Sequence, residues 1–402
     1  MALSSYVVAN EVKAPAAAHT VGFPPTGTVK ASLAAKSLAV RIARQPGAGV
    51  SSGEVAIARE AYSAEPLSST ALSVIILSLR AGEHRNEMLT FAGKLSRRNG
   101  LLNEEQIRLA AVQGDDAAFF RWLSRSVLTN NELRTRYVGA MAEATAREGA
   151  VAALAPVVGP NPEWANFYWR QVLRRPASLS NAAQLRLAIA AAPWRQTIIK
   201  EADQQLVLGL VNRSKFETAH EVFKGLRGTK SAQSREILAG GDFAEQPRLA
   251  PFDWQLAVSG ALGAAIDEKQ KLLTVSAIGG ARGPAARQLI NLAPGTYRLS
   301  WSLTSSAPIA PQSLVARLDC AERGVKSAGM ITVPLTVGTN VASFSVPDVA
   351  CRWHWFSVDI SLPDGAPGVD AYFRKISLLP ASEGKIIRPI PPMGRTSNST
   401  PN

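Results

Sequence analysis

The stretch LAPGTYRLSWSLT, residues 292–304, decides the fold class of the second half of this 402-residue chain. From residue 297 onward its side chains alternate between apolar and polar. The apolar set is Tyr297, Leu299, Trp301 and Leu303, and the polar set is Arg298, Ser300, Ser302 and Thr304. A period of two is that of a β-strand with one buried face. The stretch therefore predicts a strand over residues 296–304 whose apolar set faces a core.

The same alternation continues on both sides of this strand. Further short strands are predicted at residues 272–277, 286–292, 313–319, 331–335, 341–346, 353–360 and 371–378. Glycines and prolines separate them. Short strands with turn residues between them are typical of an antiparallel β-sandwich or jelly roll. We expect this domain to span residues 238–380.

Before residue 238 the apolar residues follow a helical period instead. One buried helical face is marked by Ala71, Leu72, Ile75, Ile76 and Leu79. Breaks at Gly82, Gly114 and Gly149 recur at separations of 32 and 35 residues, and Gly82 is expected to end the helix before it. The pattern predicts repeated pairs of helices over residues 34–237.

Two segments of this region resemble the tetratricopeptide repeat. AREAYSAEP (58–66) is similar to the second helix of that repeat with its terminal proline, and SKFETAHEVFKGL (214–226) is similar to its turn and second helix. The resemblance implies a solenoid of stacked helix pairs that binds a protein partner. A plain irregular helical domain is the alternative.

The predicted fold class is therefore a multidomain chain, with an α-helical tetratricopeptide-like solenoid followed by an antiparallel β-sandwich. Residues 1–33 are rich in Ala, Pro, Gly, Ser and Thr and are expected to form a flexible leader. Residues 381–402 hold four prolines among Ser, Asn and Thr and are expected to be disordered.

The motifs of the second domain resemble, in their order, the jelly-roll carbohydrate-binding modules attached to polysaccharide-degrading enzymes. They are GGDF (240–243) with Trp254, RQL (287–289) leading to LAPGTYRLS (292–300), and AYFRKISL (371–378). The resemblance implies that GGDF belongs to the first strand and that the domain binds a glycan. Arg374 and Lys375 stand where many such modules carry an aspartate beside a structural calcium, so no metal site is predicted.

The strand at 353–360 suggests where a glycan would bind. Its apolar face carries Phe356, Val358, Ile360 and Leu362, which places the side chains of alternate residues on the opposite, polar face. The glycan-binding candidates are Trp353, Trp355, Ser357, Asp359, Arg287 and Arg298. Aromatic rings on a polar face suit the flat C–H face of a sugar. Alternatively, a loop or the helical domain covers both tryptophans. His354, on the apolar face, is expected to be a hydrogen-bonded structural histidine.

Two cysteines, Cys320 and Cys351, lie on the predicted sandwich strands 31 residues apart. They form either a disulfide or two buried thiols. A disulfide would suit the periplasm or cell envelope. The first 30 residues contain no signal peptide and the chain contains no apolar run long enough for a membrane span. The expected location is thus the periplasm or envelope if a leader lies upstream, and the cytoplasm otherwise.

The formal net charge of +13 comes mainly from the helical region, where residues 1–240 carry 29 Lys and Arg against 19 Asp and Glu. Basic residues recur at helical spacings, including Arg80, Arg85, Lys94, Arg97, Arg98, Arg108, Arg121, Arg125, Arg134 and Arg136. They form either solvated helix faces or a surface for an anionic polymer. Nucleic acid is not expected, since no recognised nucleic-acid motif is present.

No catalytic residues or cofactors are predicted. The four histidines are widely separated, and no H-E-x-x-H, G-x-S-x-G or phosphate-loop pattern occurs. The predicted function is that of a non-enzymatic scaffold, with helical repeats that engage a protein and a sandwich that binds a glycan, in bacterial envelope polysaccharide production or export. The alternatives are a purely structural adaptor and an anionic-polymer binder.

Overall fold

A computed structural model describes residues 25–129, 133–227, 236–322, 331–348 and 351–381. The chain divides into two compact units, residues 1–226 and 227–402. The first is helical and the second contains two antiparallel sheets, as the sequence predicts. Among the described residues, no helix is both long enough and apolar enough to cross a membrane.

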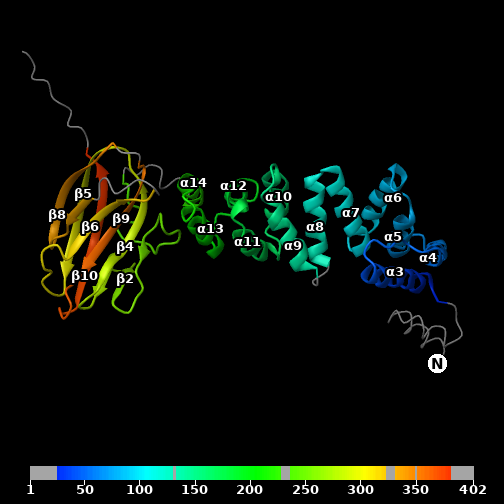
Figure 1. Cartoon of the computed structure of the whole chain (residues 1–402), viewed down its shortest axis with the longest axis horizontal. Coiled ribbons are helices and arrows are strands. Elements are labelled where there is room, and N and C mark those ends of the chain that lie inside the picture. Colours follow the sequence, from blue (N-terminus) through cyan, green and yellow to red (C-terminus); the bar gives the residue numbers. More distant parts are fainter. Residues whose placement is uncertain (1–24, 130–132, 228–235, 323–330, 349–350, 382–402) are drawn as a thin grey trace, which may run out of the picture. The chain divides into compact units, whose positions relative to one another are not determined.

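The helical unit is a succession of short α-helices (Figure 1). They are α3 (Gly27–Arg44), α4 (Ser52–Ala64), α5 (Ser69–Ser78), α6 (Glu83–Leu95), α7 (Gly100–Gln113), α8 (Asp116–Thr129), α9 (Arg134–Ala144), α10 (Ala150–Val158), α11 (Ala165–Leu173), α12 (Leu179–Ala190), α13 (Glu201–Val211) and α14 (Phe216–Arg227), with a 3₁₀ turn, η1 (Pro176–Ser178), before α12. Local sequence sets several of their ends. Ser51 and Glu54 form a reciprocal capping box at α4, and Gly114 ends α7 in the left-handed conformation.

The predicted leader is shorter than residues 1–33, because α3 already begins at Gly27. The Thr26 side chain accepts a hydrogen bond from the backbone N of Val29 at the start of the helix. Ala31 of α3 packs in a cluster with Ala61 of α4 and Ala71 of α5. Composition alone suggested a tether, but these alanines permit close helix packing. Residues 1–24 and 382–402 lie outside the described residues.

Gly82 does not end a helix as predicted. Helix α5 stops at Ser78, and Gly82 is instead the residue that precedes α6. The side chain of Arg85 explains part of this connection, since its Nε donates to the carbonyl of Ile76 at 3.2 Å and its guanidinium pairs with Glu105 at 2.7 Å. The tight turn is thus held by side-chain bonds to α5 and α7.

From α3 to α9 each helix contacts the next one, and from α8 to α13 helices also contact the next but one. Such contacts join α8 with α10, α10 with α12, α9 with α11 and α11 with α13. Hydrogen bonds also span about one helix pair. Ser178 Oγ donates to the carbonyl of Ala142, and Asn181 Nδ2 donates to that of Thr145, in both cases across 36 residues. This is how a helical repeat buries its faces against its neighbours. The tetratricopeptide identity itself stays a prediction.

A buried ion pair stabilises the turn between α12 and α13. Arg186 and Asp203 are each 3% exposed. Nε of Arg186 donates to Oδ1 of Asp203 at 2.6 Å, and its Nη1 donates to the carbonyl of Gln196 at 2.7 Å. Because the guanidinium satisfies both a carboxylate and backbone carbonyls, the buried charges are compensated.

The β-unit contains two five-stranded antiparallel sheets (Figure 1). Its strands are β1 (Gln255–Leu256), β2 (Leu262–Asp267), β3 (Leu272–Ala277), β4 (Arg282–Asn291), β5 (Gly295–Ser305), β6 (Leu314–Cys320), β7 (Ile331–Pro334), β8 (Gly338–Val346), β9 (Trp353–Ser361) and β10 (Val369–Pro380). One sheet has the order β1-β4-β9-β6-β7, and the other has the order β2-β3-β10-β5-β8. We call these the β9 sheet and the β10 sheet.

All eight predicted strands are present, and two further strands, β1 and β2, precede the first of them. β1 is a pair of residues, and β2 has the sequence LGAAID, in which Gly and Ala give little alternation. The apolar set of β5 is buried as predicted, and Trp254 and Phe356 pack edge to face in the same core. The inner faces of the two sheets therefore form one sandwich core.

The GGDF motif forms a turn rather than the predicted first strand. Gly240 has a positive φ of 61°, and Gly241 lies so close to β10 that a Cβ there would come within 2.0 Å of the carbonyl oxygen of Ile376. The backbone N of Ile376 donates to the carbonyl of Gly241 at 2.9 Å. The glycines permit this close approach, and Phe243 then enters the core.

Candidate functional site

A row of polar residues crosses the outer face of the β9 sheet from edge to edge. Strand register aligns Gln255 of β1, Arg287 of β4, Ser357 of β9, Arg317 of β6 and Thr332 of β7. These residues alternate with the core residues of β9, so their side chains belong to the outer face. We call this set the polar row. Neighbouring strands are about 4.8 Å apart, so it extends over about 19 Å.

Trp355 lies beside the polar row. It is two residues before Ser357 on β9, so the two side chains are neighbours on the same face. Its Cα partners are Leu289 on β4 and Asp319 on β6. The guanidinium carbon of Arg287 is 4.5 Å from the centroid of the Trp355 ring, within the range of a cation–π contact. The indole is half-buried, so part of a flat aromatic surface remains accessible next to hydrogen-bonding groups.

On the other side of the polar row, Arg317 pairs with Asp359 at 3.3 Å. Among the described residues, two buried atoms of this pair, Nε of Arg317 and Oδ1 of Asp359, have no hydrogen-bond partner. Buried polar atoms are normally satisfied by protein or by another molecule. The pair lies against a cavity of about 580 Å³, to which Arg282, Ser313 and Thr332 also contribute. This end of the face can therefore donate and accept further hydrogen bonds.

The charges of this region influence one another. Burial raises the pKa of the Asp319 carboxyl above its usual range; Arg317 opposes this rise, and the carboxylate of Asp359 adds to it. One arginine thus lies between two carboxyl groups. The arrangement offers both donors and acceptors to a neutral polyhydroxyl ligand.

Trp353 does not contribute to this accessible surface, although the sequence predicted it beside Trp355. It lies on the same face of β9 but is only 2% exposed. Phe252, in the segment leading to β1, packs edge to face against it with ring centroids 5.8 Å apart. Trp353 is therefore covered, as in the alternative given for both tryptophans. Of the two, only Trp355 belongs to the candidate site.

Arg298 is on the wrong sheet for the predicted site. It lies on β5, where its Cα partners are Leu379 of β10 and Ser343 of β8. It is exposed as its alternation predicts, but on the outer face of the β10 sheet. The structure brings together Arg287, Trp355, Ser357 and Asp359 and leaves out Trp353 and Arg298.

Cys320 and Cys351 form a disulfide, with Cα atoms 6.1 Å apart. It ties the end of β6 to the residues that precede β9. Nearby, the Glu322 carboxylate accepts hydrogen bonds from the backbone N of Arg352 at 3.0 Å and of Trp353 at 3.2 Å. The start of β9 is thus fixed next to the covered tryptophan.

His354 is less completely satisfied than the sequence predicted. It is buried, and its Nδ1 has no hydrogen-bond partner in the part of the chain that the structure describes. Burial lowers the pKa of its imidazole, while the Arg352 carbonyl and the Glu322 carboxylate oppose this effect. The ring lies on the inner side of β9, away from the polar row.

Four residues of this face are not identified from the sequence. They are Gln255, Arg317, Asp319 and Thr332. Gln255 holds Arg287 in place, since its Oε1 accepts from Nε of that residue at 2.9 Å. The alternation of the strand at 313–319 was a usable signal for Arg317 and Asp319, but only the strand register shows that they adjoin Trp355.

Among the described residues, no group of three or more His, Cys, Asp or Glu side chains could hold a metal ion. Asp242 is exposed in the turn described above.

Comparison with known proteins shows structural similarity to carbohydrate-binding modules. A CBM4 structure is 18% identical to this chain. The match covers 36% of this chain and 99% of the CBM4 chain, with a TM-score of 0.27. TmCBM61 in complex with β-1,4-galactotriose is 15% identical, with coverage of 37% and 100% and a TM-score of 0.25. A family 16 carbohydrate-binding module is 16% identical, with coverage of 31% and 99% and a TM-score of 0.21. No ligand is carried over from them to this chain.

No protein-family model matches the chain, and no curated protein matches it significantly.

Proposed function

We propose that this chain is a non-enzymatic, two-part binding protein. Its β-unit binds a glycan across the outer face of the β9 sheet, and its helical unit holds a protein partner. The setting predicted from the sequence, envelope polysaccharide production or export, stays a prediction. So does the absence of catalysis.

The observation that carries the glycan proposal is the position of Trp355 beside the polar row. A sugar presents a flat C–H face and a rim of hydroxyl groups. An aromatic contact contributes about 1 kcal/mol beyond its buried area, and charged partners such as Arg287 strengthen hydrogen bonds to hydroxyls. Both kinds of group lie side by side on this face.

The Arg317 side chain also supports the glycan proposal. It is 39% exposed, and its guanidinium carries donors besides the one that pairs with Asp359. These donors can bond to sugar hydroxyls. Since the row extends over about 19 Å, a chain of several sugar rings suits it better than a single sugar.

A glycan array with the full chain, followed by calorimetric titration of the bound oligosaccharide, tests this proposal. Trp355→Ala should weaken binding by about tenfold, the loss of one aromatic contact and its area. Tyr372→Ala is the matched control, because Tyr372 is a half-buried aromatic residue on the outer face of the β10 sheet. Its substitution should leave the affinity unchanged.

Two results would contradict the glycan proposal. One is the absence of binding to any glycan, which favours the purely structural adaptor. The other is an equal loss of affinity in the Trp355 and Tyr372 variants, which shows that the β9 sheet is not the binding face.

A further inference from the structure

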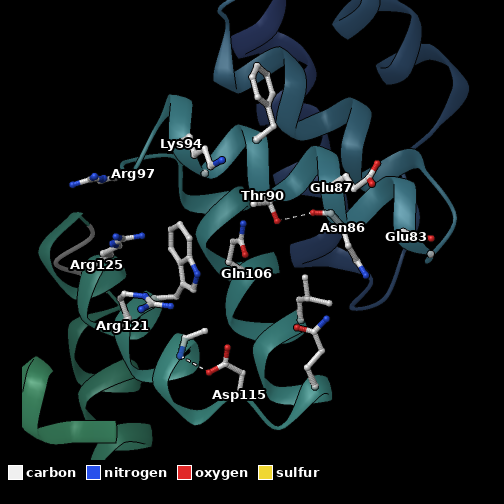
Figure 2. A pocket seen from close by; sticks show the side chains of 17 residues that line it. Glu83, Asn86, Glu87, Thr90, Lys94, Arg97, Gln106, Asp115, Arg121 and Arg125 are labelled. Carbon is white, nitrogen blue, oxygen red and sulfur yellow. Dashed lines mark hydrogen bonds between the residues drawn. The ribbon is translucent and has the colours of Figure 1, made fainter.

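A groove lies along the helices α6, α7 and α8 (Figure 2). Its volume is about 980 Å³, and it is lined by residues of all three helices. Four of the lining residues are basic, namely Lys94, Arg97, Arg121 and Arg125. Figure 2 shows Arg97, Arg121 and Arg125 along one side of the groove. We call these four the basic cluster.

The walls of the groove are held together by close packing and a buried hydrogen bond. Gly93 of α6 faces the Trp122 ring of α8, and a Cβ at Gly93 would come within 3.1 Å of that ring. Nε2 of Gln106 on α7 donates to the carbonyl of Leu89 on α6 at 2.8 Å. The groove is therefore preformed, which lowers the entropic cost of binding a ligand there.

The basic cluster differs from other arginines of the helical unit in its lack of acidic partners. Arg41, Arg85 and Arg186 each pair with a carboxylate. In the part of the chain that the structure describes, no residue of the basic cluster forms an ion pair. Unpaired cations gathered in one groove favour an anionic ligand.

Arg125 shows that these charges affect one another. Its guanidinium lies 4.4 Å from the centroid of the Trp122 ring. Burial lowers the pKa of this guanidinium, and the positive charges of Arg97 and Arg121 lower it further. A bound carboxylate would relieve this repulsion.

The other side of the groove has a different character. Figure 2 places Glu83 and Glu87, from the first half of α6, away from Arg121 and Arg125. Phe91, which also lines the groove, is 51% exposed. A third acidic lining residue, Asp115, accepts a hydrogen bond from the backbone N of Ala118 at the start of α8. A ligand that fits is therefore negative where it meets the four basic residues, neutral or positive near Glu83 and Glu87, and carries an apolar group for Phe91.

We propose that this groove binds an acidic segment of a partner protein, with carboxylates on the basic cluster and an apolar side chain against Phe91. This deepens, and rests on, the proposed role of the helical unit in holding a protein partner. A nucleic acid suits the groove less well. Its evenly spaced phosphates would meet Glu83 and Glu87, and Arg125 already covers a face of the Trp122 ring, on which a base would stack.

The test uses the full chain and fluorescence anisotropy. The probe is a fluorescein-labelled peptide with a run of four glutamates followed by a leucine and two lysines, and the same peptide with glutamine in place of glutamate is its neutral counterpart. The double substitution Arg97→Gln and Arg121→Gln should weaken binding of the acidic peptide by about tenfold or more, because two charged partners are lost. The neutral peptide should not bind.

The matched control is Arg59→Gln with Arg174→Gln. Both residues are exposed, lie outside the groove lining, and change the net charge equally. This variant should bind the acidic peptide within about twofold of the unsubstituted chain, since net charge alone acts weakly at a distance. Circular dichroism and thermal unfolding of both variants check that the helical unit is folded in each.

Four results would overturn the proposal. The first is no binding of the acidic peptide, and the second is an equal loss in both double variants. The third is tighter binding of a single-stranded oligonucleotide of the same net charge, abolished by the Arg97 and Arg121 substitutions, which would make the groove a nucleic-acid site. The fourth is crosslinking of a partner protein to the helical unit outside the groove, at a level that the groove substitutions do not change. That result would overturn the groove proposal, whereas the wider proposal of a protein partner would stand.

Discussion

The guanidinium of Arg287 lies over the indole of Trp355, with Cζ 4.5 Å from the ring centroid, and its Nε donates to Gln255 at 2.9 Å. The arginine is therefore held from two sides. It fixes the orientation of the ring and places a positive charge next to it, on a face whose other polar groups lie in register across five strands. We therefore expect recognition of a sugar by this face to depend on both residues.

Substitution of Arg287 should weaken glycan binding without unfolding the β-unit. Arg287→Ala removes the contact with the Trp355 ring and a charged donor. We expect the affinity to fall by about three- to tenfold, the range of one exposed cation–π contact with a hydrogen bond. Calorimetric titration measures it. Arg298→Ala, an exposed arginine on the outer face of the β10 sheet, is the control, and a similar loss there would contradict the prediction.

Trp353 and Trp355 should respond differently to substitution. Trp353 is buried against Phe252. Trp353→Ala should therefore lower the free energy of unfolding of the β-unit by about 3 to 5 kcal/mol through the cavity that it leaves. Guanidinium unfolding followed by circular dichroism measures this loss. Trp355→Ala should cost much less stability, and equal losses for the two would show that both rings are structural.

For these two tryptophans, the sequence predicts the face of the strand but not the exposure of the side chain. Alternation places both on the outer face of β9, which is correct. It cannot show that Phe252, about a hundred residues earlier, covers one of them. The exposure of a side chain on a strand depends on packing with residues distant in sequence. The residues next to it along the strand carry little information about that packing.

The same distinction holds for the other site residues. Alternation correctly predicts that Arg298 is exposed, but only strand order shows that β5 belongs to the other sheet. Arg317 was on a predicted strand and was not recognised, because its place next to Ser357 depends on the register of β6 with β9. Within the helical half, capping and apolar spacing predict helices, whereas the alanine face of α3 was mistaken for a tether.

The disulfide should be detectable in the purified chain. Under denaturing, non-reducing conditions a thiol reagent should find no reactive thiol, since Cys320 and Cys351 are paired. Substitution of both by serine should lower the free energy of unfolding by roughly 3 to 4 kcal/mol in the chain-entropy model, given the 31-residue separation. Two reactive thiols in protein that was never reduced would contradict this prediction.

The stability of the helical unit should decrease at acidic pH because of His220. Burial, with the nearby charge of Lys224, lowers the pKa of His220 to about 4, while Glu217 opposes the shift. In the unfolded chain the ordinary value is 6.5. Between these values the unfolded chain binds a proton that the folded chain does not, so stability falls as the pH drops through 6.5 and levels off near 4.

Thermal unfolding of the full chain between pH 7 and pH 4 tests this dependence. His220→Gln should reduce the slope of the unfolding midpoint against pH in this window. His84→Gln, at an exposed position of α6, is the control and should leave the slope unchanged. An unaltered slope in the His220 variant would contradict the assignment.

A crystal structure of the full chain with an oligosaccharide that the glycan array identifies would show directly whether the β9 sheet binds sugar. We predict a sugar ring against Trp355, with hydroxyl groups bonded to the guanidinium groups of Arg287 and Arg317. A sugar bound to the β10 sheet or to the helical unit, with the polar row unoccupied, would contradict the account.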